Sequence, residues 1–112
     1  MIKMIKGPIN KQNVEKVKAL DGVYRKTLTY NNDVMLCFFL LEKDVVIPLH
    51  EHKAHQIGYV LKGKIKFITE TREFIANKGD SYVFDSNEKH GAELLEDSEV
   101  IEVFNPTRED YK

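Results

Sequence analysis

The sequence predicts a single all-β domain, a sandwich or barrel of short antiparallel strands. Turn-forming residues recur about every 8–12 residues from Val23 onward, which is typical of such folds. Thr, Val, Ile, Tyr and Phe dominate residues 23–104, often in alternation with polar residues, and this favours strands over helices. The chain has 112 residues, which is the size of one domain and leaves no room for a second core.

The N-terminal residues differ from the rest of the chain. We predict an N-terminal arm over residues 1–22 and the β domain over residues 23–112. Residues 13–20 carry apolar side chains at roughly helical spacing after a capping asparagine, which predicts a short helix of at most two turns. Asp21-Gly22 then marks a turn.

The expected strands follow one another between turn residues. Residues 23–30 are separated from the apolar run 34–42 by Asn31-Asn32-Asp33, which is a hairpin signal. The apolar run is continuous, so we expect it to be buried on both faces. Asn105-Pro106 ends the last strand because proline cannot donate to a sheet. The remaining strand segments are expected at 47–52, 55–63, 64–71, 72–80, 81–85 and 92–104.

Charge and composition exclude several classes of protein. Lys and Arg number 17 and Asp and Glu number 18, a balance that argues against a nucleic-acid binder or a polybasic membrane anchor. No apolar run approaches the ~20 residues of a membrane span, and the first residues carry no apolar signal core. Cys37 is the one cysteine and cannot form an internal disulfide. We therefore expect a cytoplasmic protein with no nucleic-acid or membrane partner.

Three of the four histidines lie within six residues. In an extended strand His50 and His52 project to the same side, so their imidazoles can bind one metal ion. Imidazole suits Zn, Ni, Fe, Co and Cu alike. The alternative is a solvated loop in which the histidines occur by chance.

Two longer motifs resemble the signatures of the cupin superfamily. The first signature reads His-x-His, three or four residues, Glu, six residues, Gly; residues 50–63 read HEHKAHQIGYVLKG, with Gln56 in place of Glu. The second signature resembles residues 79–94, GDSYVFDSNEKHGAEL, in which Gly79 and His90 are retained. Asp85, Asn87 and Leu94 stand where Pro, Gly and Asn are usual. The resemblance covers about residues 34–104.

This resemblance implies a small jelly-roll-like antiparallel barrel of two packed sheets, with one divalent metal ion inside. The implied ligands are His50, His52, Gln56 and His90, and the ion is Ni, Zn, Fe, Mn or Co. His55 competes with Gln56, although its position in the strand alternation is opposite to that of the other ligands. Gln56 supplies a neutral oxygen, so the ion keeps its double positive charge and favours an anionic ligand or a developing enolate.

A narrower resemblance is to the cupins of pectin degradation, the KdgF type, which linearise 4,5-unsaturated monouronates. It rests on HQIGYVLKGK and on residues 78–111. The functional acid, aromatic and arginine of that group map onto Glu102, Phe104 and Arg108, where Glu102 is one methylene longer than the usual Asp. The resemblance implies that Glu102 moves a proton and that Arg108 holds the substrate carboxylate.

The strand pattern bears on the same residues. Val100, Glu102 and Phe104 share one strand face. If this face points inward, Glu102 is a buried carboxylate that needs a metal or Arg108 nearby; if it points outward, Glu102 is a surface acid. Tyr59 and Tyr82 are interpreted as packing residues.

Three functional hypotheses follow. The first is a metal-dependent enzyme that opens the ring of an unsaturated uronate, a small anionic sugar. The alternatives are an iron-dependent cupin dioxygenase and a non-catalytic cupin that binds metal or sugar. Small barrels expose strand edges, so we also expect a homodimer, with residues 1–30 at the seam.

Overall fold

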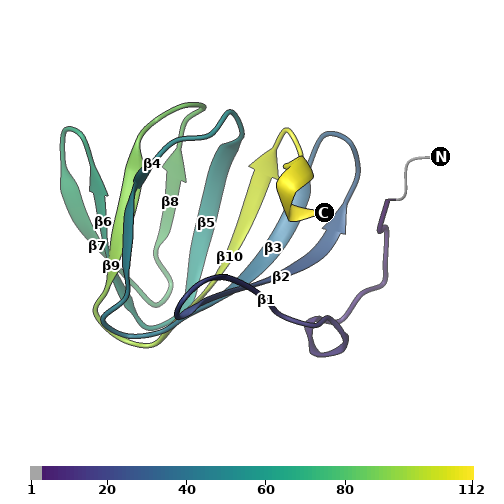
Figure 1. The fold of residues 1–112 in the computed structure, drawn as a ribbon, viewed down its shortest axis with the longest axis horizontal. Coiled ribbons are helices and arrows are strands. Elements are labelled where there is room, and N and C mark those ends of the chain that lie inside the picture. The colour runs from purple at the N-terminus through teal and green to yellow at the C-terminus, as the bar shows by residue number, and fades with distance from the viewer. Residues whose placement is uncertain (1–3) are drawn as a thin grey trace.

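The computed structural model describes residues 4–112 and consists of two antiparallel sheets packed face to face (Figure 1). One sheet has six strands in the order β1-β2-β3-β10-β5-β8, and the other has four in the order β4-β9-β6-β7. The predicted all-β fold with two sheets is confirmed. The elements are η1 (Lys11–Asn13), β1 (Val17–Leu20), β2 (Val23–Tyr30), β3 (Met35–Leu41), β4 (Val46–His50), β5 (His55–Lys62), β6 (Lys64–Thr69), β7 (Glu73–Asn77), β8 (Ser81–Phe84), β9 (His90–Leu94), β10 (Ser98–Asn105) and η2 (Glu109–Tyr111).

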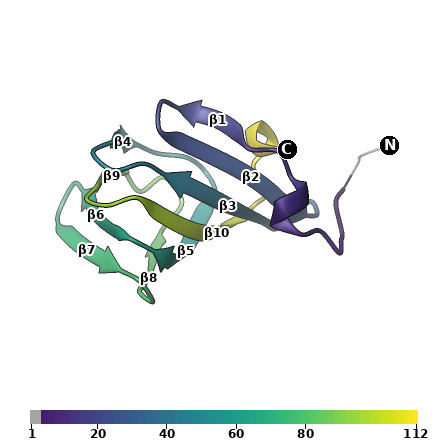
Figure 2. The same ribbon diagram turned by 90° about the horizontal axis from the view of Figure 1, so that it is seen from below.

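The helix predicted over residues 13–20 is wrong. The segment contains the end of the short 3₁₀ turn η1 and then β1, which lies at the edge of the six-stranded sheet beside β2 (Figure 2). A helix of two turns gains little on its own, whereas the free edge of β2 offers backbone hydrogen bonds along its length. All four residues of β1 are exposed, so backbone pairing decides the local structure. The division into an arm over 1–22 and a domain over 23–112 stays a prediction.

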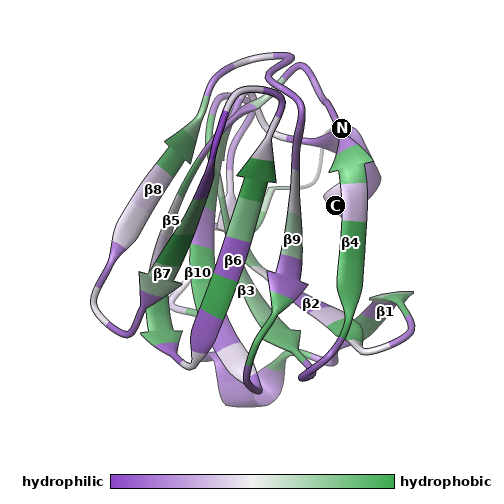
Figure 3. Ribbon diagram, turned by 90° about the vertical axis from the view of Figure 1, so that its left-hand side faces the viewer, coloured by the Kyte–Doolittle hydropathy of each residue, from purple (hydrophilic) through white to green (hydrophobic). Residues whose placement is uncertain are grey.

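The core fills the space between the two sheets. Alternation along β10 buries Val100, Glu102 and Phe104 on the inner face, and the same period buries Ile65 and Phe67 on β6. Figure 3 shows the alternating apolar and polar bands along β6. Of the two orientations that the sequence leaves open, the face of β10 with Glu102 points inward, and Glu102 is not a surface acid.

The N-terminal segment covers part of the outer face of the six-stranded sheet. Phe38 on β3 points outward but is buried, and the Lys11 ammonium lies 4.9 Å from its ring centroid. The burial of β3 on both faces is therefore confirmed at Phe38, while Leu36 and Leu40 beside it are only partly buried. Among residues 4–112, no helix is long and apolar enough to cross a membrane.

Gly63 carries the chain from one sheet to the other. It joins the end of β5 to the start of β6 with a φ of 98°, a conformation that favours glycine. A Cβ atom at this position would lie 2.1 Å from the Ser98 Oγ. This explains the glycine of the first motif, because a side chain at residue 63 would collide with Ser98 at the start of β10 and force the two segments apart.

Candidate metal centre and its cavity

Three histidines from two parts of the chain meet at one end of the space between the sheets. His50 ends β4 and pairs with His90 at the start of β9, and His52 lies in the loop that follows β4. One ring nitrogen from each lies within 4.8 Å of the others. β4 ends at His50, so a regular strand does not carry both His50 and His52, but the two side chains still converge on one point.

Backbone carbonyls fix the tautomer of each imidazole. A carbonyl oxygen can only accept, so a ring Nδ1 that contacts one carries the hydrogen, and the lone pair is left on Nε2. Such outer hydrogen bonds are typical of metal-binding histidines. The Nδ1–O distances are 2.9 Å from His50 to Pro48, 2.7 Å from His52 to Ala54 and 2.8 Å from His90 to Glu88.

The buried nitrogen of His90 has no hydrogen-bond partner. Its Nε2 is sealed from solvent and is the one buried side-chain polar atom among residues 4–112 without a partner. Burial lowers the pKa of His90 to about 4, so the imidazole is neutral near neutral pH. Its ring stacks on Phe84, with centroids 4.4 Å apart and planes 5° from parallel. A neutral, fixed and unpartnered nitrogen of this kind fits a metal ligand.

Gln56 brings a fourth acceptor to the same point. Its amide nitrogen donates to the Glu102 carboxylate, which leaves its Oε1 facing the His52 Nε2 at 2.9 Å. With the His52 hydrogen on Nδ1, both of these atoms present lone pairs to each other. A cation placed between them would turn this repulsion into two favourable contacts. Imidazole nitrogens and amide oxygens together suit a divalent transition metal, so the four predicted ligands fit such an ion.

His55 points away from this cluster. It is the first residue of β5 and is exposed, whereas Gln56 next to it is buried. The His55 Nδ1 accepts a hydrogen bond from the backbone N–H of Ser86 at 3.1 Å. The alternation along β5 therefore favours Gln56 over His55, as expected from the sequence.

Glu102 lies beside the histidines and is held by two donors. It is only 7% exposed, and its Oε2 accepts hydrogen bonds from the Gln56 amide and, at 2.7 Å, from the Tyr82 hydroxyl. Burial raises the pKa of the Glu102 carboxyl, and these two donors and the Arg108 charge offset part of that rise. The chain thus keeps a carboxyl group next to the candidate metal ligands.

Tyr82 packs in the core as the sequence predicted, whereas Tyr59 is 43% exposed, so the packing interpretation is wrong for Tyr59. Tyr82 also makes a polar contact that the sequence interpretation did not include. Its ring packs 4.3 Å from Phe67, and its hydroxyl reaches Glu102. Glu102 pairs with Gly58, which in turn pairs with Tyr82 on β8, so the three lie in one row across the sheet. A Cβ at Gly58 would lie 2.3 Å from the Tyr82 hydroxyl oxygen. The contact between Tyr82 and Glu102 depends on how β8, β5 and β10 are paired, and this pairing cannot be read from the sequence.

A cavity of about 490 Å³ opens from these residues toward the C-terminal segment. This volume lies within the roughly 300–1,000 Å³ range of small-molecule sites. The lining includes His50, Gln56, His90, Glu102, Phe104 and Arg108.

Phe104 and Arg108 are brought to the same cavity. Phe104 is fully buried, with its ring 5.9 Å from that of His52. The Arg108 guanidinium lies 5.3 Å from the Phe104 centroid and 3.8 Å from that of Tyr111. It also forms an ion pair with Asp110, with an N–O distance of 2.9 Å. Six of the seven predicted site residues therefore line this cavity, and the seventh, His52, lies beside it with its ring centroid 5.0 Å from that of His90.

The family model for the cupin domain, Cupin_2, matches residues 37–104. The chain therefore belongs to the cupin family. It is 36% identical over 93 residues to the pectin degradation protein KdgF of Dickeya dadantii (strain 3937), an alignment that covers 81% of this chain and 84% of that protein.

Two solved structures share the fold over nearly the whole chain. KdgF from a Halomonas species has a TM-score of 0.89 at 28% identity and covers 96% of this chain and 99% of its own. An RmlC-like cupin from Shewanella frigidimarina NCIMB 400 has a TM-score of 0.90 at 22% identity, with coverage of 98% and 100%. The likeness to the second protein concerns the fold alone.

The departure at Asn87 is explained by its backbone. Asn87 occupies the position where the second cupin motif usually has glycine, and its φ is 60°. Asparagine is among the few residues other than glycine that adopt this left-handed conformation readily. The turn before His90 is therefore kept although the motif glycine is absent.

Proposed function

We propose that this chain is a metal-dependent enzyme that converts a 4,5-unsaturated monouronate, a product of pectin or alginate breakdown, to its linear keto form. The identity to a pectin degradation protein supports the substrate class. The observation that carries the reaction is a buried carboxyl group, Glu102, which accepts a hydrogen bond from Gln56 and lies beside the histidine cluster at the wall of a cavity.

The reaction is an isomerisation that needs one proton to move. The substrate is a cyclic hemiacetal whose C4=C5 double bond carries the ring oxygen as an enol ether. When the bond between C1 and the ring oxygen breaks, the C1 hydroxyl loses its proton and becomes the aldehyde. The ring oxygen becomes the enolate oxygen of C5, and protonation at C4 turns the enolate into a ketone. No electrons are exchanged with an oxidant, so the reaction requires no dioxygen.

His50, His52, Gln56 and His90 would hold the metal ion. When bound, a divalent ion supplies Lewis acidity that stabilises negative charge developing on a substrate oxygen. With each histidine Nδ1 on a backbone carbonyl, the ligand atoms would be three Nε2 lone pairs and an amide oxygen, so the ligand set itself would add no negative charge to that of the ion. The site is thereby suited to an anionic sugar.

Glu102 moves the proton between the C1 hydroxyl and C4. Its Oε2 is occupied by the Tyr82 and Gln56 donors, which fixes the carboxyl plane and leaves Oε1 for proton exchange. General acid–base catalysis by a positioned carboxyl contributes typically ~10²–10⁴-fold in rate. Phe104 closes the wall beside His52 and keeps water from the reacting carbons. Arg108 gives the cavity a positive charge that attracts the uronate.

The test is incubation of the purified, metal-loaded protein with an unsaturated monouronate. We expect the ultraviolet band of the conjugated C4=C5 group to disappear faster than it does spontaneously. The Glu102→Gln variant should return the rate close to the spontaneous one, whereas His55→Ala, a matched change outside the cluster, should not.

Two results would contradict the proposal in different ways. Oxygen uptake that matches substrate loss would favour the dioxygenase hypothesis. Saturable binding of the uronate without any turnover would favour a non-catalytic sugar-binding cupin.

A further inference from the structure

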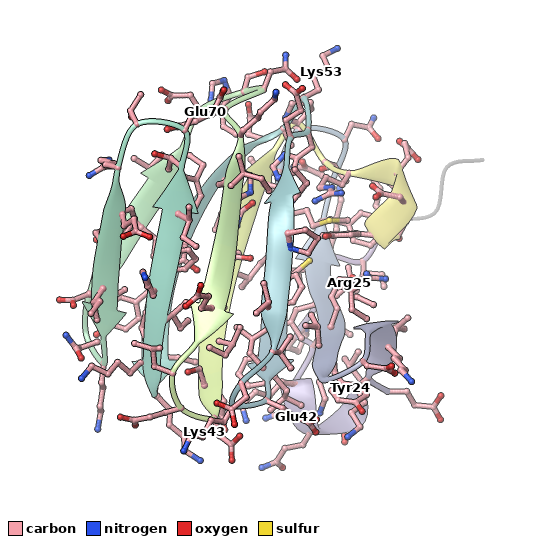
Figure 4. All side chains as sticks on the ribbon, turned by 60° about the vertical axis from the view of Figure 1, so that its left-hand side comes forward. Tyr24, Arg25, Glu42, Lys43, Lys53 and Glu70 are labelled. Carbon is pink, nitrogen blue, oxygen red and sulfur yellow. The ribbon has the colours of Figure 1, made fainter. Side chains whose placement is uncertain are left out.

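A second arginine lines the cavity and lies outside the predicted site. Arg25 is on β2, where the alternation that buries Val23 also turns Arg25 toward the space between the sheets. The side chain is only 9% exposed. Figure 4 shows Arg25 beside the C-terminal segment that carries Tyr111. A cationic side chain buried to this degree normally has a carboxylate partner.

Arg25 has no such partner in the part of the chain that the structure describes. Its Nε donates to the Thr27 hydroxyl at 3.3 Å, and this is the one hydrogen bond its guanidinium makes there. The guanidinium also lies 4.2 Å from the Tyr111 ring centroid. No carboxylate among residues 4–112 comes within 4.0 Å of it.

The two arginines of the cavity therefore differ in what they can offer a ligand. Arg108 already donates to both oxygens of Asp110, at 3.3 and 2.9 Å. Arg25 has Nε occupied by Thr27, but its two terminal nitrogens are unpaired and not sealed from solvent, and the side chain lines the cavity. These nitrogens form the side of the guanidinium that can bind a carboxylate with two parallel hydrogen bonds.

The surroundings of Arg25 also hold it in place. The Thr27 hydroxyl, which accepts from Arg25, itself donates to the Tyr111 carbonyl oxygen at 2.5 Å. The Tyr111 ring contacts both guanidinium groups, Arg25 at 4.2 Å and Arg108 at 3.8 Å from its centroid. Little side-chain entropy is left for Arg25 to lose when an anion binds, which favours affinity.

We propose that Arg25 is a carboxylate-binding residue of this cavity and contributes more to the affinity for a sugar acid than Arg108 does. That the sugar acid is a uronate rests on the proposed function. Arg25 lies outside the histidine cluster and forms no hydrogen bond or ion pair with Glu102. Its contribution is therefore to substrate capture and not to proton transfer.

The experiment measures substrate capture with and without turnover. Wild type, Arg25→Gln, Arg25→Lys and Arg108→Gln are loaded with the metal that elemental analysis finds, and kcat and KM are measured with the unsaturated monouronate. Binding of galacturonate, which has the carboxylate but no double bond, is measured by calorimetry, with neutral galactose as the uncharged counterpart. Arg72→Gln, a change at an exposed arginine away from the cavity, is the matched control.

We expect Arg25→Gln to raise KM and to weaken galacturonate binding by roughly 10- to 100-fold, the usual range for a charge-assisted hydrogen bond. The kcat value, the metal content and galactose binding should change little. Arg25→Lys keeps the charge but loses the planar fork, so its effect should be smaller, and Arg108→Gln should also cost less than Arg25→Gln. Arg72→Gln should match wild type.

The outcomes separate this proposal from the proposed function. Galacturonate binding that depends on Arg25, in a protein without turnover, would support the carboxylate site and contradict the enzyme. Wild-type KM and galacturonate affinity in both Arg25 variants would overturn the carboxylate site whatever the turnover. A wild-type protein that neither binds galacturonate nor turns over the unsaturated uronate would overturn both.

Discussion

The Tyr82 hydroxyl donates a 2.7 Å hydrogen bond to the Glu102 carboxylate from two strands away. The strand between them places Gly58 in the same row, and the absence of a side chain there lets the tyrosine ring lie across the backbone. The absence of a side chain at Gly58 therefore allows the Tyr82 hydroxyl to reach Glu102, where it is one of two hydrogen-bond donors.

Gly58→Ala should destabilise the protein and disturb Glu102. The new Cβ would lie 2.3 Å from the Tyr82 hydroxyl oxygen, so the ring must move. Overpacking of this kind costs about 1–3 kcal/mol of the free energy of unfolding, measured by chemical denaturation. In a Tyr82→Ala background the same change should cost much less, because the ring is gone. Equal costs in both backgrounds would show that the ring does not limit this position.

Removing a histidine of the cluster should remove the metal. His50→Ala and His90→Ala each delete one of three converging ring nitrogens, so bound metal measured by elemental analysis should fall sharply. The melting temperature should fall with it, because an ion that binds the folded state alone stabilises that state. His55→Ala, whose ring contacts the Ser86 backbone, should keep its metal. Full metal occupancy in the first two variants would refute the ligand assignment.

Gln56→Glu should separate metal affinity from turnover. A carboxylate adds negative charge to the ligand set, so metal content should hold or rise. The same change replaces the amide that donates to Glu102 with a second carboxylate, and two such groups in contact repel. We expect turnover of the unsaturated uronate to fall at least about tenfold, since the site loses positive charge and Glu102 loses a donor. Unchanged or faster turnover would show that the neutral ligand is dispensable.

Local patterns in the sequence could predict much of the site. The alternation in residues 50–63 favours Gln56 over His55, because strand side chains alternate strictly. The alternation along 98–105 places Glu102 on one face with Val100 and Phe104, but it leaves open whether that face points inward, which the structure decides. Patterns could not reveal Tyr82 or Arg25, because their roles depend on which strands are neighbours in the sheet. The short helix expected near residue 17 fails because a neighbouring strand edge outweighs weak helical spacing. The homodimer stays a prediction.

Burial of Cys37 should make stability depend on alkaline pH. Burial raises the pKa of its thiol to about 11, from an ordinary value near 9.0. Between these values the folded state binds more protons than the unfolded state, so the free energy of unfolding falls as pH rises through this window. Below pH 9 the thiol is protonated in both states, and this loss of unfolding free energy has not begun. Above pH 11 the loss is complete and amounts to about 3 kcal/mol. The difference in unfolding free energy between wild type and Cys37→Ala should therefore shrink as pH rises toward 11; a constant difference would contradict this.

Glu102→Gln should abolish proton transfer while leaving the fold and the metal in place. The amide keeps the shape of the carboxyl but has no proton to exchange, so kcat should fall by roughly 10²–10⁴-fold. Metal content should be unchanged, because Glu102 is not one of the four ligands. It contacts only the amide nitrogen of Gln56, whereas the ligand atom of Gln56 is its amide oxygen. KM should change little, since capture of the carboxylate is assigned to arginine. Glu99→Gln, on the same strand but facing outward, is the matched control and should behave as wild type. A Glu102→Gln protein with wild-type kcat would discard the mechanism even if the metal site proved correct.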